Sequence, residues 1–152
     1  MTLRQANLGD IAGMHRVRCA VRENALSDPN RITEADYIAA LEDLGRTWVI
    51  EVDEAVAAFA TAYKAGSIWA LFVHPDHEGR GYGKALLSTV VDWLWSLGLR
   101  RLWLTTGPAT RAEGFYLSQG WQPCGIDPGG DLRLELLCPD NSFGPKALPA
   151  QA

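Results

Sequence analysis

The sequence predicts a single domain built on a mixed α/β sheet. Segments with strand-like and helix-like periodicity alternate along the chain in the order β-α-α-β-β-β-α-β-α-β-β. The length of 152 residues, with 47 % hydrophobic and 21 % charged residues, suits one domain with a sizeable core. We place this domain at residues 1–138. The remaining residues, 139–152, are rich in proline and small side chains, which is typical of a loosely ordered C-terminal tail.

The first part of the chain is expected to form a short strand, a helix and a loop. Residues 2–7 are predicted to be the strand. Asp10 is predicted to cap a helix. Its apolar stripe and neighbouring positions follow three-to-four spacing: Ile11, Met14, Val17, Arg18 and Val21. The stretch 22–32 is polar and contains a proline, which indicates a loop.

A second helix is predicted over residues 34–44. Thr33 and Asp36 have the spacing of a capping box, with Asp in place of the usual Glu. Gly45 stands where a glycine commonly ends a helix.

The middle of the chain is rich in predicted strands. Residues 47–52 and 55–64 flank the dipeptide Asp53-Glu54, which suits a hairpin turn. Residues 67–73 are apolar on both faces, as in a central strand.

A long helix is expected to begin near Gly81 and to be closed by Gly98. Its apolar stripe faces the core: Leu86, Leu87, Val90, Val91, Leu94 and Leu97. The elements predicted after it are a strand at 100–106, a helix at 110–120 closed by Gly120, and a hairpin made of 121–126 and 131–138.

Composition and charge limit the kinds of partner. A net charge of −4 with scattered Lys and Arg argues against a nucleic-acid binder. No apolar run approaches the roughly 20 residues that span a bilayer, and no signal-peptide core is seen, so we expect a cytoplasmic protein with no membrane partner. The cysteines, Cys19, Cys124 and Cys138, are too far apart for a metal site, and we expect free, mostly buried thiols.

The turn before the long helix is the strongest functional feature of the sequence. It holds three glycines and two cations: Gly79, Arg80, Gly81, Gly83 and Lys84. The first N–H groups of a helix have no internal partner and carry the positive end of the helix dipole. Glycines allow a ligand to approach these groups closely, so the turn is predicted to bind an anion such as a phosphate.

Two well-known nucleotide motifs do not fit this turn. The P-loop would need glycine at Glu78 and a hydroxyl side chain at Ala85. The dinucleotide motif G-x-G-x-x-G would need glycine at Lys84. A nucleotide-binding regulatory domain is therefore a poor interpretation.

The stretch "FVHPDHEGRGYGKALL" resembles the coenzyme A pyrophosphate loop of the GNAT superfamily of N-acetyltransferases. The family pattern is an apolar strand ending in V-x-P, followed by Q/R-x-x-G-x-G/A at the start of a long helix. Gly81 and Gly83 match the two small positions, whereas Glu78 replaces the usual Gln or Arg. The stretch 114–121, "GFYLSQGW", resembles a second family motif, although Ala109 stands where Asn is usual.

The resemblance spans about residues 2–138 and implies the family's fold and chemistry. The fold would be α+β, with a mixed, mostly antiparallel sheet of six to seven strands and about four helices. The cosubstrate would be acetyl-CoA, with no metal. The residues implied to hold it are the main chain of Phe72 and Val73 for the pantetheine arm and thioester carbonyl, and Gly79, Arg80, Gly81, Gly83 and Lys84 for the pyrophosphate.

The resemblance also points to residues for proton transfer. Tyr116 is the predicted acid, because a phenol with a pKa near 10 is protonated at neutral pH and can donate to a departing thiolate. Glu23 is the predicted base. Asp28, His74 and a chain of water molecules are the alternatives.

The predicted reaction is direct transfer of an acetyl group to a primary amine within a ternary complex. A small-molecule amine is the first choice of acceptor, and a protein N-terminus or lysine is the second. Thr105, Thr106, Trp69 and Trp103 are placed near the acceptor. A coenzyme A-binding module without catalysis is the alternative function. A homodimer is an expected assembly, because dimers are common in the resembled family.

Overall fold

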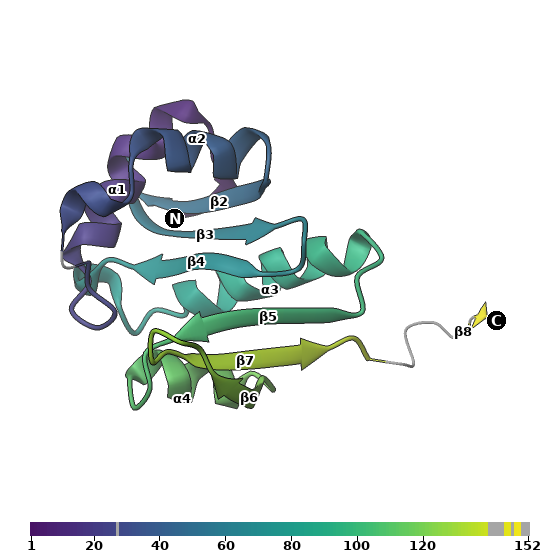
Figure 1. The fold of residues 1–152 in the computed structure, drawn as a ribbon. Coiled ribbons are helices and arrows are strands. Elements are labelled where there is room, and N and C mark those ends of the chain that lie inside the picture. The colour runs from purple at the N-terminus through teal and green to yellow at the C-terminus, as the bar shows by residue number, and fades with distance from the viewer. Residues whose placement is uncertain (27, 140–144, 147, 150–152) are drawn as a thin grey trace.

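The computed structural model describes residues 1–26, 28–139, 145–146 and 148–149. The domain holds seven strands and four α-helices in the predicted order (Figure 1): β1 (Thr2–Gln5), α1 (Ile11–Ala20), α2 (Glu34–Glu42), β2 (Gly45–Val52), β3 (Ala55–Tyr63), β4 (Ile68–Val73), α3 (Tyr82–Ser96), β5 (Arg101–Thr106), α4 (Arg111–Ser118), β6 (Gln122–Ile126) and β7 (Leu132–Leu137). Three 3₁₀ turns lie between them: η1 (Leu8–Asp10), η2 (Pro29–Arg31) and η3 (Pro75–His77).

The seven strands form two antiparallel sheets, with orders β1-β2-β3-β4 and β5-β7-β6. The mixed, mostly antiparallel α/β fold is therefore confirmed, with the strands divided between two sheets. β4 and β5 lie side by side (Figure 1), but their hydrogen-bonded contact is a single parallel bridge between Ser67 and Trp103. Beyond this bridge, at the other end of β4, the facing edges of the two strands are not paired with each other.

Helices cover both faces of the first sheet. α1 and α2 contribute Met14, Val17 and Tyr37 to a core cluster that also contains Val49 and Phe59 of the sheet. α3 packs on the opposite face through a second cluster, to which α4 adds Tyr116. The strict alternation of side chains along a strand explains the division, since neighbours such as Val49 and Ile50 enter different clusters.

Asp10 is the N-cap residue of α1, as predicted, but its side chain does not act as the cap. Asp10 makes no capping hydrogen bond to α1. Instead, Asn7 begins η1, which leads directly into α1, and its side chain accepts a hydrogen bond from the Gly9 N–H at 2.9 Å. The capping box predicted before α2 is confirmed: Thr33 N–H donates to the Asp36 carboxylate at 2.8 Å, and Asp36 N–H donates to the Thr33 hydroxyl at 3.3 Å.

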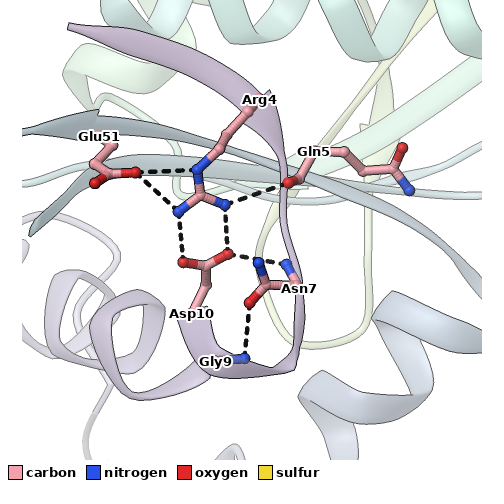
Figure 2. Close-up of polar contacts among 6 residues, drawn as sticks. All are labelled: Arg4, Gln5, Asn7, Gly9, Asp10 and Glu51. Atoms are coloured by element: carbon pink, nitrogen blue, oxygen red, sulfur yellow. Dashed lines mark hydrogen bonds and ion pairs between the residues drawn. The ribbon is translucent and has the colours of Figure 1, made fainter. Parts of the chain in front are cut away.

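Asp10 belongs to a charged network that ties the N-terminal strand to the sheet (Figure 2). Its carboxylate accepts two hydrogen bonds from the Arg4 guanidinium, at 2.8 and 2.9 Å, and a third from the Asn7 N–H at 2.9 Å. Arg4 also donates to Glu51 of β2 at 3.0 Å. Asp10 is buried, and its hydrogen bonds to Arg4 are the main reason that its pKa is lowered. The network thus joins β1, η1 and β2.

The prediction that Gly45 ends the second helix is wrong. α2 ends at Glu42, and Gly45 is the first residue of β2. A Cβ atom at Gly45 would overlap the carbonyl of Ala62 on β3. Close approach of the two strands therefore explains this glycine. Gly98 and Gly120 follow the ends of α3 and α4, as predicted.

The cysteines are free, as expected, but only Cys138 is buried, whereas Cys19 and Cys124 are exposed. The tail predicted at 139–152 lies largely outside the described residues, and its described part holds two-residue strands β8 (Pro145–Lys146) and β9 (Leu148–Pro149). In the part of the chain that the structure describes, no helix is both long and apolar enough to cross a membrane.

Candidate active site

A cavity of about 530 Å³ opens where β4 ends and α3 begins. We call it the glycine-turn cavity. Its lining comes from four segments: 21–24, 71–73, 77–84 and 111–116. The predicted coenzyme residues Phe72, Val73, Gly79, Gly81, Gly83 and Lys84 all line it. Arg80 does not; its exposed guanidinium lies 3.4 Å from the His77 ring nitrogen Nδ1.

The mouth of α3 has the geometry of an anion site. Gly79 and Gly81 have φ angles of 78° and 81°, in the left-handed region that favours glycine. Gly81 is the N-cap residue, so the first N–H groups of this 15-residue helix have no helical acceptor. No atom lies within 4 Å of a Cβ built at Gly79 or Gly81, which leaves open space beside these backbone groups. The helix dipole and Lys84 add positive charge to the turn.

Glu78 forms an ion pair with a partner that the sequence did not indicate. An acidic residue beside an anion site should pair with a nearby cation, and Arg80 and Lys84 are the candidates closest in sequence. The structure pairs it instead with Arg111 at the start of α4, with 3.0 Å between Nη1 and Oε1. Arg111 also lines the glycine-turn cavity, although its side chain is 74 % exposed.

The edge of β4 that faces β5 is open beside the glycine-turn cavity. β3 pairs with the other edge of β4, through partners such as Phe59 with Phe72 and Ala58 with Val73. The Ser67–Trp103 bridge lies at the far end of β4, and no other strand in the described part of the chain pairs with this edge of β4 near the cavity. An extended ligand could add to such an edge through main-chain hydrogen bonds.

A second cavity, of about 700 Å³, lies on the α1 and α2 side of β4. We call it the aromatic cavity, because six aromatic side chains line it: Tyr37, Phe59, Tyr63, Trp69, Phe72 and Tyr116. Trp69 stacks on Tyr63 with ring centroids 5.5 Å apart. The predicted acceptor-site residues Trp69, Thr105 and Thr106 line this cavity. Trp103 is not among its lining residues and instead lies under the Arg133 guanidinium.

The two cavities meet at five shared residues: Asn24, Leu71, Phe72, Ala112 and Tyr116. Tyr116 is buried, and burial raises the pKa of its phenol. Among the described residues, none accepts a hydrogen bond from its hydroxyl. The phenol is therefore protonated at neutral pH and available to a ligand.

Asn24 holds the 22–32 loop against the end of β5 at this junction, and it was not identified from the sequence. Its amide nitrogen donates to the Thr106 hydroxyl at 3.2 Å, and its amide oxygen accepts from the Gly107 N–H at 2.9 Å. Its backbone has a φ of 57°, a conformation that Asn adopts more readily than most residues. An Asn in a polar loop gives no signal of such a long-range contact.

The carboxylate of Glu23 has a structural partner. Its Oε1 accepts a hydrogen bond from the Arg111 N–H at 2.8 Å, at the first residue of α4. Glu23 lines the glycine-turn cavity and is absent from the lining of the aromatic cavity. Asp28 caps η2, and the His74 ring accepts from the Asp76 N–H at 3.1 Å, so both alternatives also have local structural contacts.

The family model described as "Acetyltransferase (GNAT) family" matches residues 12–121. The chain belongs to this GNAT acetyltransferase family. The matched residues run from α1 to the end of α4 and include the segments that the two cavities share. The sequence resemblance is thus confirmed at the level of the family.

Curated relatives of this GNAT chain include amino-acid acetyltransferases. The one from Azotobacter vinelandii is 25 % identical over 130 residues, which are 82 % of this chain and 28 % of that protein. The one from Ralstonia nicotianae is 29 % identical over 141 residues, 88 % of this chain and 29 % of that protein. The chain thus spans less than a third of the length of these relatives.

Solved GNAT structures share the fold. A phosphinothricin acetyltransferase from Sinorhizobium meliloti, in complex with AcCoA, has a TM-score of 0.76 and 20 % identity, covering 99 % of this chain and 93 % of that one. A ribosomal-protein-alanine N-acetyltransferase from Brucella melitensis has a TM-score of 0.74 and 18 % identity, covering 91 % and 100 %. Among the described residues of our chain, no cluster of three or more His, Cys, Asp or Glu could hold a metal ion.

Proposed function

We propose that this chain is an N-acetyltransferase that moves an acetyl group from acetyl-CoA to a primary amine by direct transfer in a ternary complex. The meeting of two cavities at Phe72 and Tyr116 carries the proposal. One cavity has the chemistry of a phosphate site and the other that of an acceptor site. Two substrates bound in them would meet at one point, as direct transfer requires.

The glycine-turn cavity fits the cosubstrate. The N–H groups at the mouth of α3, with Lys84, would hold the pyrophosphate, and Arg80 would add longer-range positive charge. The open edge of β4 around Phe72 and Val73 would hold the pantetheine arm and polarise the thioester carbonyl. When bound, acetyl-CoA supplies the activated acetyl group.

Tyr116 would act as the acid. The amine nitrogen forms the new C–N bond, the C–S bond breaks, and the phenol of Tyr116 donates a proton to the departing thiolate. A raised pKa keeps this proton on the phenol until the thiolate develops. The proton lost by the amine goes to a base, for which Glu23 is the candidate, acting directly or through water.

Calorimetric titration with acetyl-CoA and with coenzyme A tests the donor site, and thiol release across a library of primary amines tests catalysis. Small-molecule amines are the first acceptors to test, and peptides with a free N-terminus or lysine are the second. Binding without thiol release would favour the non-catalytic coenzyme A-binding module. Absence of binding would rule out both functions.

Variants of two tyrosines distinguish a catalytic acid from a residue that only lines a cavity. Tyr116→Phe should lower kcat about 10² to 10³-fold, the usual contribution of acid catalysis, with little change in acetyl-CoA affinity. Tyr63→Phe is the matched control, because Tyr63 lines only the aromatic cavity. If Tyr116→Phe and Tyr63→Phe have the same kcat at several pH values, Tyr116 is not the acid.

A further inference from the structure

Arg18 has a buried nitrogen without a partner. It lies in the last turn of α1 and lines the aromatic cavity. Its guanidinium carbon is 4.2 Å from the centroid of the Phe72 ring. Its Nη1 atom is buried and has no hydrogen-bond partner among the described residues. Buried polar groups in proteins are almost always hydrogen-bonded, so this one calls for an explanation.

Burying part of the Arg18 guanidinium costs free energy, because a cation is removed from water. Burial lowers the pKa of Arg18, which reflects the unfavourable environment of its charge. Even so, Arg remains protonated at neutral pH, because its ordinary pKa is above 12. The face of Phe72 offsets part of this cost through a cation–π contact but supplies no hydrogen-bond acceptor.

Carboxylates in the cavity wall do not neutralise Arg18. Asp36 lines the cavity, but its carboxylate is held in the capping box with Thr33. Asp131 also lines it, and neither carboxylate forms an ion pair with Arg18 in the described residues. The nearby Tyr37 hydroxyl is 2.9 Å from His15 Nδ1 and is already hydrogen-bonded.

A ligand carboxylate would complete the site. Arg binds carboxylates through paired, charge-assisted hydrogen bonds, and these are stronger where water is excluded. Arg18 lies against Phe72, and Phe72 belongs to both cavities. An anion held there would be close to the point where the amine must meet the donor, so few bonds can separate the two groups.

We propose that Arg18 binds the carboxylate of the acceptor, and that the acceptor is a small amino acid with an apolar or aromatic side chain. The aromatic cavity would receive that side chain. The assignment rests on the proposed acetyltransferase function and makes it more specific. It also excludes a protein N-terminus as the main acceptor, because an N-terminal residue has no free α-carboxylate.

Matched acceptors test the assignment by turnover. L-phenylalanine is compared with phenethylamine and L-phenylalaninamide, and L-leucine with isoamylamine, over a pH series that corrects for the neutral fraction of each amine. The wild type should show at least a tenfold higher kcat/KM for each amino acid than for its partners without a carboxylate. Arg18→Met, which keeps an unbranched apolar stem but removes the guanidinium, should reduce this ratio about tenfold, and Arg18→Lys should restore part of it.

A binding measurement tests Arg18 without any reaction. In the presence of coenzyme A, 3-phenylpropionate should bind the wild type and bind Arg18→Met at least tenfold more weakly, whereas 3-phenylpropanamide should bind neither well. Arg101→Met is the control, because Arg101 is exposed and lines none of the cavities described above. Thermal unfolding checks that each variant is folded.

The outcomes separate the two proposals. If amines are acetylated with no preference for a carboxylate, or if Arg18→Met leaves the preference intact, the Arg18 assignment is wrong and the acetyltransferase function stands. If 3-phenylpropionate binds through Arg18 but no amine in the library releases thiol, the proposed function falls and the carboxylate site stands. Failure of both measurements overturns both.

Discussion

Replacement of Asp10 by Asn should destabilise the domain by about 2 kcal/mol. In the wild type, each oxygen of Asp10 accepts from Arg4, and Oδ2 also accepts from the Asn7 N–H. Asn keeps the shape but replaces one oxygen with an NH₂ group that faces a donor. At least one charge-assisted hydrogen bond is lost, which is worth about 1.5–3 kcal/mol. Arg4 retains 33 % side-chain exposure and can turn toward water, so we expect the loss to stay near the middle of that range.

Urea unfolding at pH 7 measures this change, with Asp92→Asn on the exposed face of α3 as the control. The loss corresponds to a fall in Tm of about 4 to 8 °C for a domain of this size. The pH dependence supplies a second check. Because the pKa of Asp10 is lowered in the folded state, its contribution is present above the ordinary carboxyl pKa of about 3.9. It is lost as the pH falls through the folded-state pKa.

The difference in the free energy of unfolding between the wild type and Asp10→Asn should therefore be largest at pH 7 and should decrease below about pH 4. Arg4→Met combined with Asp10→Asn should cost less than the sum of the two single changes, since both remove the same contacts. A difference that does not vary with pH, or an Asp10→Asn variant as stable as Asp92→Asn, would refute the reasoning.

Three glycine substitutions give further predictions. Gly45→Ala should cost about 2 to 3 kcal/mol in urea unfolding, because the new Cβ would meet the Ala62 carbonyl and force two strands apart. Gly107→Ala would place a Cβ 2.6 Å from the Asn24 side-chain oxygen, so it should raise the acceptor KM severalfold and also weaken acetyl-CoA binding, measured by calorimetry, because Asn24 lines both cavities. Gly81→Ala should cost about 1 kcal/mol through its positive φ alone and should also weaken coenzyme A binding by about tenfold, because the Cβ would obstruct the helix mouth.

Local patterns predicted the fold well because they depend on near neighbours. The capping box of Thr33 and Asp36 spans three residues, and the alternation along β2 sorts Val49 and Ile50 to opposite faces whatever the rest of the chain does. The glycine turn could also be predicted, because glycine is the residue that most readily adopts the positive φ angles of Gly79 and Gly81.

Contacts between distant segments could not be predicted in the same way. From the sequence, Glu78 could point away from its turn or pair there with Arg80 or Lys84, yet its partner is Arg111, the first residue of α4. Arg18 looked like one more position on a helical stripe, and only the packing of α1 against β4 reveals a nitrogen without a partner in the described part of the chain. Charge and polarity say that such side chains need partners, but tertiary packing decides which partners are in reach.

A ligand bound between β4 and β5 would join the two sheets, because among the described residues these strands meet at the single Ser67–Trp103 bridge. Main-chain N–H groups along the open edge of β4 should exchange rapidly with solvent deuterium in the free protein, because no neighbouring strand protects them. A pantetheine arm laid along this edge would slow their exchange and couple the two sheets mechanically. At a ligand concentration a hundred times its Kd, the folded state would gain about 2.7 kcal/mol. The protein would then be most rigid when such a ligand is bound.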